Sequence, residues 1–485
     1  MVVFIVLAAL DNVALALVPP LVTPISRDLG VGESGVAAAF SVSLLVTAVS
    51  AVGWAYLGDR YDRKRLLVTG TLVWALGVGA TTLATGYSQF VAAQVVAAVG
   101  LGTVASVGFS VVSDLIAPRR RGLVMGLWGL SQGVGAVIGV GMGGLLGSQD
   151  WRHPFRVLTV VGLAATVAYL FTYRIPRGHS DPELRDLHRA GIEYEHRISR
   201  ADLPKIFARR TNVWLAAQGF TSQLAFGALT WLPRLFQAKA EAQGYAESTA
   251  IVLGSVFSML AMSGALLALA GGLVGDWLQR RTPRGRALVA SAGVLAAVPL
   301  YIALFFFPLE LDLPPQERDR TAVLRGLLRG LVTEPTLTAT FVLALVAVAL
   351  MNAQSPNWYA LLAEVNPPEH RGTAFSLGNL LNGAGRTTGT YLVAHAFAAA
   401  ERALPPPTNY AVALAAFQLF FIPTGVMYWL ASRTAPRDIA SVRLLMRRRA
   451  AASPTASDGQ PGAVAAEPLP SATGVGAPSP AGQPL

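Results

Sequence analysis

The chain has 485 residues, of which 53% are hydrophobic and 13% are charged, and it carries a formal net charge of +11. Soluble domains usually carry about 25% charged residues, so the composition argues against a soluble protein. The chain has no cysteine, which excludes disulfides, thiolate metal sites and cysteine catalysis. Its basic residues recur at alternate loops instead of on one face, which argues against nucleic acid as a partner.

Twelve apolar segments follow one another along the chain, and each has about the 20 residues that a helix needs to cross the hydrocarbon core. The first opens without a basic region before it, so we expect a membrane span there and not a cleavable signal peptide. The segments fall at 2–22, 35–57, 66–86, 90–113, 122–146, 155–174, 212–236, 248–274, 287–307, 337–362, 373–398 and 409–431.

Lysine and arginine gather in the loops after spans 2, 4, 6, 8 and 12. The positive-inside rule makes these loops cytoplasmic, which predicts a multi-pass protein of the cytoplasmic (inner) membrane with both termini inside. The segment 308–335 lies on the outer side and is an exception, since it holds four arginines beside five acids. Within it, Thr321–Val332 spaces its arginines four apart, and this predicts either a short surface helix or a solvated loop.

The two halves of the chain repeat one signature, in which an acid, a proline, an arginine and a glycine follow spans 4 and 10. These residues are Asp114, Pro118, Arg121 and Gly122 in the first half, and Glu364, Pro368, Arg371 and Gly372 in the second. Parallel six-span halves are a transporter architecture with the substrate site between them. We therefore expect six-helix halves at 1–174 and 212–431, a cytoplasmic linker at 175–211, and a basic segment with a disordered tail at 432–485.

Four motifs resemble those of the major facilitator superfamily, and the resemblance extends to about residue 435. They are Tyr56–Arg65 after span 2, its weaker copy Gly272–Asp276 with Arg280 and Arg281, the glycine motif Gly135–Gly144 of span 5, and Trp151–Arg152. The resemblance implies an all-α membrane protein with twelve transmembrane helices in two pseudo-symmetric halves. Leu57–Lys64 and Ile175–Gly178 look like the spinster-like group, and Leu10–Asn12 with Pro19 looks like drug:proton antiporters. The span 4 arginine that is common in proton-coupled drug exporters falls at about Val96 here, and the span 4 acid of spinster-like proteins falls near Thr103. These two departures from the family pattern argue against proton coupling through span 4.

The charged motifs predict a latch that holds the cytoplasmic side closed. Asp59 can face the start of span 11, because free N–H groups at a helix N-terminus favour an anion, and Arg63 can reach Asp114. In the second half, Asp276 would face span 5 and Arg280 would reach Glu364. The alternative is that these charges only set topology. The proposed gating residues are Asp59, Arg60, Arg63, Asp114, Arg121, Asp276, Arg280, Glu364 and Arg371.

Two ionisable residues lie deep in apolar spans, where a charge is costly unless it is paired or hydrated. Asp11, next to Asn12 in span 1, is a candidate for binding a cationic group or carrying a proton. Arg386 in span 11 is a candidate for binding an anionic headgroup, or for pairing with Asp11. Structural contacts are the alternative for both residues.

Polar and aromatic residues of the second half predict the lining of a substrate cavity. They are Gln218, Gln223, Trp231, Asn352, Gln354, Asn357 and Asn382. For each of them, an interhelical hydrogen bond is the alternative. Gly135, Gly139, Gly141, Gly143 and Gly144 predict close helix packing, as small residues do in membranes.

No nucleotide-binding loop, metal motif or catalytic signature is present, so we expect no enzyme activity and no cofactor. Our hypothesis is a monomeric secondary transporter that moves an organic, amphipathic or hydrophobic solute by alternating access, with export and proton coupling as its finer features. Its partners would be this small-molecule, lipid-like substrate and the membrane lipids. One alternative is uptake or facilitated diffusion of a small organic anion anchored by Arg386. Another is a sensor or assembly factor that keeps the fold without transporting.

Overall fold

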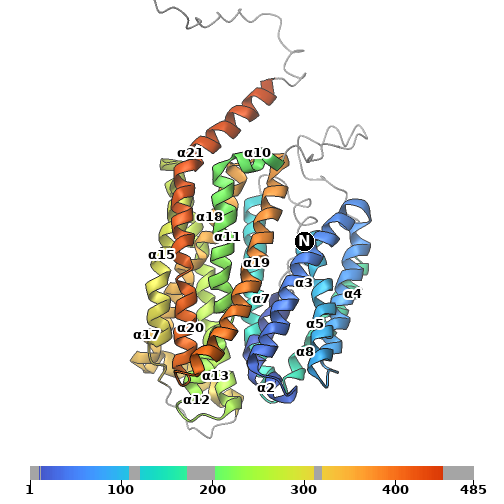
Figure 1. Ribbon diagram of the computed structural model, residues 1–485, viewed down its shortest axis with the longest axis vertical. Coiled ribbons are helices and arrows are strands. Elements are labelled where there is room, and N and C mark those ends of the chain that lie inside the picture. The colour runs from blue at the N-terminus through green and yellow to red at the C-terminus, as the bar shows by residue number, and fades with distance from the viewer. Residues whose placement is uncertain (1–9, 11, 109–120, 172–202, 311–318, 452–485) are drawn as a thin grey trace, which may run out of the picture. The chain divides into compact units, whose positions relative to one another are not determined.

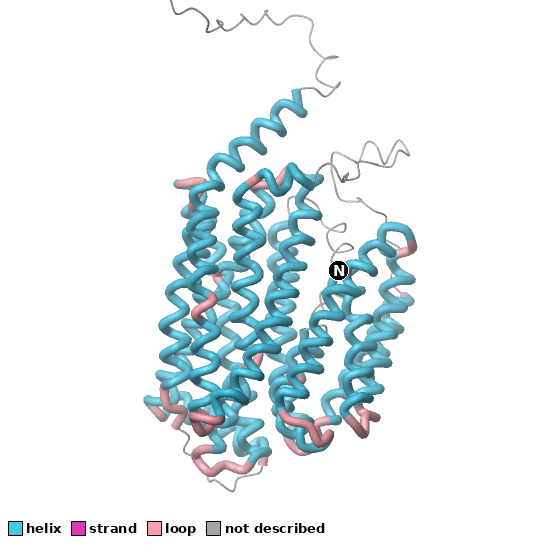
Figure 2. Tube along the Cα trace, in the orientation of Figure 1, coloured by secondary structure: helices cyan, strands magenta, loops and turns pink. Residues whose placement is uncertain are grey.

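The computed structural model describes residue 10 and residues 12–108, 121–171, 203–310 and 319–451. This described part consists of helices joined by turns and short loops (Figure 2). The chain divides into two units, residues 1–442 and residues 443–485, and the described part of the second unit is the end of one helix.

The helices of the first half correspond to the described parts of predicted spans 1 to 6 (Figure 1). The turn α2 ends the first span, and η2 is one π-helical turn that continues span 4. The elements are η1 (Pro19–Leu21), α2 (Val22–Asp28), α3 (Glu33–Arg60), α4 (Arg63–Thr81), α5 (Tyr87–Thr103), η2 (Val104–Gly108), α7 (Arg121–Gly147) and α8 (Arg152–Leu170).

The second half follows the same order, with a short helix in the linker and another in the predicted outer segment. The helix α16 shows that Thr321–Val332 is helical, and its place on the outer side stays a prediction. The elements are α10 (Leu203–Ala208), α11 (Arg210–Leu229), α12 (Leu232–Glu241), α13 (Glu247–Met262), η6 (Ser263–Leu267), α14 (Ala268–Arg281), α15 (Gly285–Phe306), α16 (Arg320–Thr333), α17 (Pro335–Asn352), α18 (Gln354–Glu364), α19 (Pro368–Glu401), α20 (Thr408–Gln418) and α21 (Phe421–Ala451).

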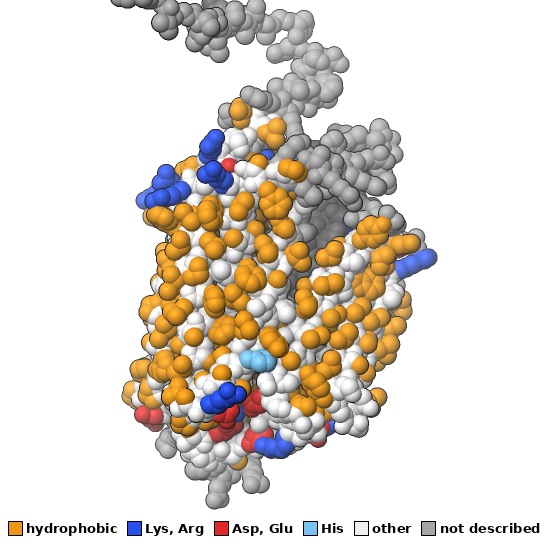
Figure 3. Space-filling view, in the orientation of Figure 1, with side chains coloured by type: hydrophobic (Ala, Val, Ile, Leu, Met, Phe, Trp, Pro, Cys, Tyr) orange, Lys and Arg blue, Asp and Glu red, His pale blue; other side chains and the backbone are white. Residues whose placement is uncertain are grey.

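Within the described ranges, seven continuous helical stretches are long and apolar enough to cross a membrane, judged by length and composition. Figure 3 shows hydrophobic side chains over the flank of the molecule and charged side chains towards its two ends. Span 7 is divided into two shorter helices, whereas span 10 is one of the seven stretches and changes helix at a proline. Pro233 has no N–H to donate to Leu229, and α11 ends at Leu229; Pro356 likewise cannot bond to Asn352, and α17 ends there.

The ends of the helices define two ends of the bundle. One, called here the Glu33 end, holds the connections between α2 and α3, α12 and α13, and α19 and α20. The opposite end, called here the Arg286 end, holds the connections between α3 and α4, α14 and α15, and α18 and α19. The two halves contact each other through α3 with α19 and through α7 with α13.

The residue that caps the start of α4 departs from the family-like motif and has a local structural role. Asp62 precedes the helix, and its carboxylate accepts hydrogen bonds from the backbone N–H groups of Lys64 at 2.9 Å and Arg65 at 3.4 Å. These are free donors at a helix N-terminus, which an aspartate cap satisfies at a gain of about 1 kcal/mol. Asp62 therefore sets where span 3 starts.

Candidate functional site

A charged network joins the two halves at the Glu33 end, and Arg234 of α12 is its centre. The Arg234 side chain is 8% exposed, and its Nε donates to both carboxylate oxygens of Glu33 on α3, at 3.1 and 3.3 Å. Its Nη1 donates to Glu241 at 3.1 Å, and its guanidinium lies 4.8 Å from the ring centre of Tyr410. The Tyr410 hydroxyl also donates to Glu33 at 3.3 Å. One buried cation therefore binds carboxylates from both halves.

Further contacts between the halves surround this network. Gln237 of α12 donates to the backbone oxygen of Pro20 at 3.0 Å, and Arg27 of α2 pairs with Glu247 of α13 at 2.5 Å. Within the first half, Thr23 donates to Glu33 at 2.7 Å and so orients the carboxylate that receives Arg234. Together these side chains close the Glu33 end across the interface between the halves.

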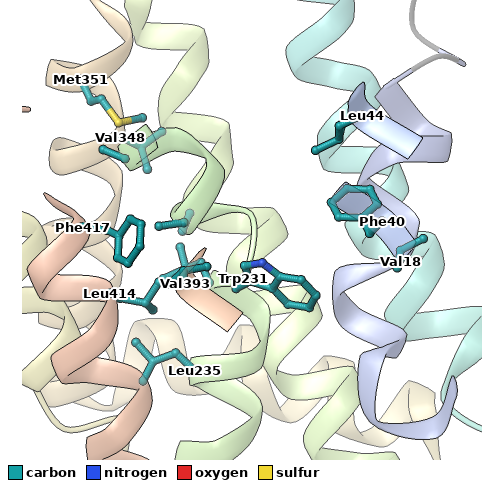
Figure 4. Close-up of a cluster of buried hydrophobic side chains, with 14 of the residues drawn as sticks. Val18, Phe40, Leu44, Trp231, Leu235, Val348, Met351, Val393, Leu414 and Phe417 are labelled. Atoms are coloured by element: carbon teal, nitrogen blue, oxygen red, sulfur yellow. The ribbon is translucent and has the colours of Figure 1, made fainter. Parts of the chain in front are cut away.

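An aromatic contact between the halves lies next to this network. The indole of Trp231 points toward Phe40 of α3 (Figure 4), and the two rings meet edge to face with centroids 6.4 Å apart. Trp231 is 2% exposed, and its Nε1 donates to the backbone oxygen of Thr390 at 3.3 Å. In this structure the indole is packed between the halves, and the prediction that Trp231 offers a stacking face to the substrate stays a prediction.

The span 5 glycines bring α7 close to helices on two sides. A Cβ on Gly139 would lie 2.5 Å from the backbone oxygen of Val13 in the first span, and one on Gly141 would lie 2.5 Å from the sulfur of Met259 in α13. Gly143 faces Leu17 and Pro20, and Gly144 faces Ser255 of α13. Gly135 is buried on the same helix. The glycines thus allow α7 to pack on its own half and on the other half at once.

A buried polar cluster lies between α11 and α18 within the second half. Ser222 donates to Oε1 of Gln354 at 3.3 Å, and Gln218 donates to the backbone oxygen of Leu215 at 3.0 Å. Among the described residues, the Nε2 of Gln354 and the Oε1 of Gln218 are buried and have no hydrogen-bond partner. Buried polar groups are usually satisfied by protein or ordered water, so these two atoms mark a place for an additional polar partner.

Other predicted lining residues divide between structural contacts and half-buried positions. Asn357 donates to the backbone oxygens of Gly271 at 3.1 Å and Ala353 at 2.8 Å, which fixes α18 against α14. Asn352 donates to its own helix, at Val348, over 2.9 Å. Half-buried residues, besides Asn352, are Asn12, Gln223, Asn382 and Arg386. The Asn382 carboxamide lies against the backbone of Gly219 on α11.

An apolar pocket lies at the side of Trp358 towards the Arg286 end. It is formed between α10, α11, α18 and α19, and Asn212 is its polar wall. The Trp358 indole donates to the backbone oxygen of Leu215 at 3.2 Å, which holds the ring against α11. The other lining residues include Ile206, Leu215, Leu362, Ala374 and Gly378.

The charged residues at the Arg286 end form a different network from the one predicted. Arg286 at the start of α15 pairs with Glu364 of α18 and, at 2.7 Å, with Asp276 of α14. Gln279 also donates to Glu364 at 2.8 Å. The expected partner Arg280 is exposed. In this structure Glu364 therefore pairs with Arg286, and Asp276 binds Arg286 of its own half, while the predicted latch of the closed cytoplasmic side stays a prediction.

Several predicted residues lie outside the described residues. These are Asp11 and Asp114, together with the side chains of Asp59, Arg60 and Arg121. Arg63 is half-buried at the start of α4. Arg371 donates to the backbone oxygens of Ala363 and Asn366, at 3.0 and 3.2 Å, and so joins the start of α19 to the end of α18.

Lys239 of α12 is a further buried cation at the Glu33 end, beyond the predicted span 212–236. It is 7% exposed, and its Nζ donates to the backbone oxygens of Leu304 at 3.3 Å and Phe307 at 2.6 Å, at the end of α15. A cation is favoured at a helix C-terminus, where carbonyl oxygens are free. Burial lowers the pKa of Lys239 to about 8.

The sequence interpretation missed Arg234, although a signal for it was present. Arg234 lies inside the predicted span 212–236, as Arg386 lies inside 373–398, so the same criterion of an ionisable residue within an apolar span selects both. Glu33 and Arg286 gave no such signal, because each stands at the polar edge of a span. Their roles depend on the packing of helices that are far apart in the sequence.

Comparisons with known proteins agree with this geometry. A family model described as Major Facilitator Superfamily matches residues 3–390. Protein spinster of Drosophila melanogaster is 25% identical over 291 residues, covering 57% of this chain and 46% of that protein. The sphingosine-1-phosphate transporter SPNS2 of Mus musculus is 24% identical over 306 residues, covering 58% of this chain and 52% of that protein. The chain thus spans about half the length of the curated relatives it matches.

Solved structures share the fold. A bacterial homologue of the human lysosomal transporter spinster, in an inward-facing and unoccupied conformation, superposes with a TM-score of 0.68 at 18% sequence identity. The match covers 90% of this chain and 97% of that one. The nucleoside transporter NupG gives a TM-score of 0.61 at 12% identity, covering 89% and 99% of the two chains. The predicted all-α architecture of two six-helix halves is consistent with these neighbours.

Proposed function

Because this chain belongs to the Major Facilitator Superfamily, a family of transporters rather than enzymes, we propose that it carries an amphipathic organic solute across a membrane by alternating access. The observation that carries the proposal is the closure around Arg234. Contacts between the halves at the Glu33 end join them across their interface, whereas Arg286 bonds to Asp276 and Glu364 of its own half. Alternating access requires closures of this kind that form at one end and break when that end opens.

The buried surfaces of the second half support an amphipathic substrate. Within the described part of the chain, Gln218 offers an acceptor and Gln354 a donor that have no hydrogen-bond partner, and apolar residues of α11, α18 and α19 lie beside Trp358. Arg386 is half-buried on α19 and supplies a positive charge for an anionic headgroup. The relative named a sphingosine-1-phosphate transporter takes a solute of this chemistry, with a long chain and a phosphate group.

Direction, coupling and location are further parts of the proposal. The basic loops after spans 2, 4, 6, 8 and 12 support the cytoplasmic membrane, with the Arg286 end and both termini inside. The Glu33 end would then face outward and is the closed end. We assign export as the direction and Asp11 as the proton carrier, because an ionisable residue inside an apolar span is a candidate functional residue by default.

The experiment that tests the substrate class is thermal unfolding of the purified full-length chain in detergent. Sphingosine-1-phosphate, a cationic amphipathic drug and a small dicarboxylate would be added separately, with sphingosine and inorganic phosphate as controls for tail and headgroup alone. Stabilisation by the amphipaths supports the proposal. Stabilisation by the small dicarboxylate, lost in Arg386→Ala, would favour uptake of a small anion. The absence of any shift would favour a protein that senses or assembles without transporting.

A further inference from the structure

The helix α16 has an exposed apolar strip that none of the described helices covers. Val323 and Leu327 are buried against the core, and α16 contacts α13 and α17. Leu328 and Val332 are 44% and 85% exposed. Each directly follows a leucine that faces the core, Leu327 or Leu331. At 100° per residue these two side chains extend the apolar arc around the helix, away from the core.

Arginines border this strip on the side opposite the core. Arg325 and Arg329 are exposed, stand one turn apart, and form no ion pair within the described part of the chain. The nearby acid Asp319 is engaged in capping α16, where it accepts from the N–H groups of Thr321 and Ala322 at 3.2 Å each. The exposed face of α16 therefore combines two apolar side chains with two exposed positive charges.

The helix is held at the Glu33 end by contacts along its length. Thr338 of α17 donates to the backbone oxygen of Leu331 at 2.8 Å, and a Cβ on Gly330 would lie 3.0 Å from Leu337. Its position therefore follows the ends of the spanning helices, where the hydrocarbon core gives way to headgroups. Basic amphipathic helices with this pattern lie in the interface, with the apolar face in the acyl boundary and the cations near phosphates.

We propose that α16 is an interfacial helix that binds anionic phospholipid headgroups of the leaflet at the Glu33 end. Leu328 and Val332 enter the boundary of the acyl chains, and Arg325 and Arg329 bind the phosphates above it. Charge complementarity selects anionic over zwitterionic lipid, and each arginine contributes about fivefold to this preference. The inference also accounts for the arginines on the outer side, which oppose the positive-inside rule. It does not depend on the proposed substrate.

The absence of cysteine allows a site-specific test in the full-length chain. Val332→Cys would carry an environment-sensitive fluorophore, and Thr333→Cys, an exposed neighbour turned towards the polar side, would be the matched control. Both would be reconstituted in vesicles of phosphatidylcholine alone and of equal parts phosphatidylcholine and phosphatidylglycerol. Quenching by aqueous iodide and by lipids with a shallow spin label would report the depth of each fluorophore.

We expect lipid-borne quenching at position 332 and iodide quenching at 333. Phosphatidylglycerol should deepen the label at 332, and Arg325→Gln with Arg329→Gln should remove this dependence on lipid charge. Equal iodide quenching at 332 and 333 in both kinds of vesicle would overturn the proposal, because α16 would then stand in water. Lipid-borne quenching that ignores phosphatidylglycerol, or that survives unchanged in the double variant, would overturn the role of the arginines.

Discussion

Arg234 binds Glu33 across the interface between the two halves, with its Nε 3.1 and 3.3 Å from the two carboxylate oxygens. Both residues belong to helices that are separate in the sequence, since α12 ends span 7 and α3 forms span 2. The same guanidinium binds Glu241 of its own helix. The closure at the Glu33 end therefore depends on one buried arginine that two carboxylates share.

Arg234→Gln should open the Glu33 end. The change leaves Glu33 and Glu241 without the cation that both bind, and losing one partner of a buried charge pair costs about 2–5 kcal/mol. Ala37, one turn along α3 from Glu33, is fully buried and reports this opening. The rate at which a membrane-impermeant thiol reagent modifies Ala37→Cys should rise strongly in the Arg234→Gln background.

Arg27→Gln is the matched control for that measurement. Arg27 also bridges the halves, through Glu247, but its side chain is 71% exposed. Solvent-exposed pairs contribute about 0–1 kcal/mol, so the modification rate at position 37 should change little. Equal rates in the two backgrounds would show that Arg234 does not control access from this end.

Gly139→Ala should destabilise the protein by about 1–3 kcal/mol, the usual range for overpacking. The added methyl group would meet the backbone oxygen of Val13 at 2.5 Å, and backbone cannot move aside as a flexible side chain does. Gly133→Ala on the same helix is the control, since a Cβ there has nothing within 4 Å. Thermal unfolding in detergent would compare the two, and equal melting temperatures would contradict the packing role.

Arg286→Gln should destabilise the second half, and Arg280→Gln should not. Arg286 joins Asp276 to Glu364 and is only 15% exposed, whereas Arg280 is exposed beside it. Charge-assisted hydrogen bonds of this kind contribute about 1–3 kcal/mol. Thermal unfolding would again report the difference. A larger loss in Arg280→Gln would restore the pairing expected from the sequence.

The lowered pKa of Lys239 predicts that the free energy of unfolding rises with pH. Burial lowers its pKa from 10.5 to about 8, so between these values the unfolded chain holds a proton that the folded chain has lost. Raising the pH through this window therefore favours the folded state, by up to about 3 kcal/mol at about 1.4 kcal/mol per pKa unit. Lys239→Met should flatten this part of the profile, and an unchanged slope in the variant would contradict the assignment.

Much of the architecture follows from the sequence because membrane helices are specified locally. Apolar length predicts each span, and the glycines of span 5 predict close packing at Gly139. In the structure, Gly139 packs on the first span, and Gly389 packs at the equivalent position on Leu224 of α11. For the segment that forms α16, the sequence left a short helix and a solvated loop as alternatives, because a four-residue spacing of arginines is compatible with a helix without requiring one.

The site was harder to predict, because it depends on contacts between distant helices. The motif copy suggested Arg280 as the partner of Glu364, but the helix that approaches Glu364 presents Arg286. Trp231 resembles a substrate contact in sequence, yet its neighbours Phe40 and Thr390 bury it. Whether a polar residue in a span lines a cavity or joins two helices is decided by the neighbouring helix, and the local sequence does not contain that information.

Transport by the full-length chain in proteoliposomes tests the central claim most directly. Vesicles loaded with a fluorescent sphingosine-1-phosphate analogue would be followed for its release, with Arg234→Gln and Arg27→Gln proteins reconstituted in parallel. The account predicts protein-dependent release that Arg234→Gln abolishes and Arg27→Gln largely retains. Release at the rate of protein-free vesicles, or equal release by wild type and Arg234→Gln, would contradict a transporter whose cycle depends on this closure.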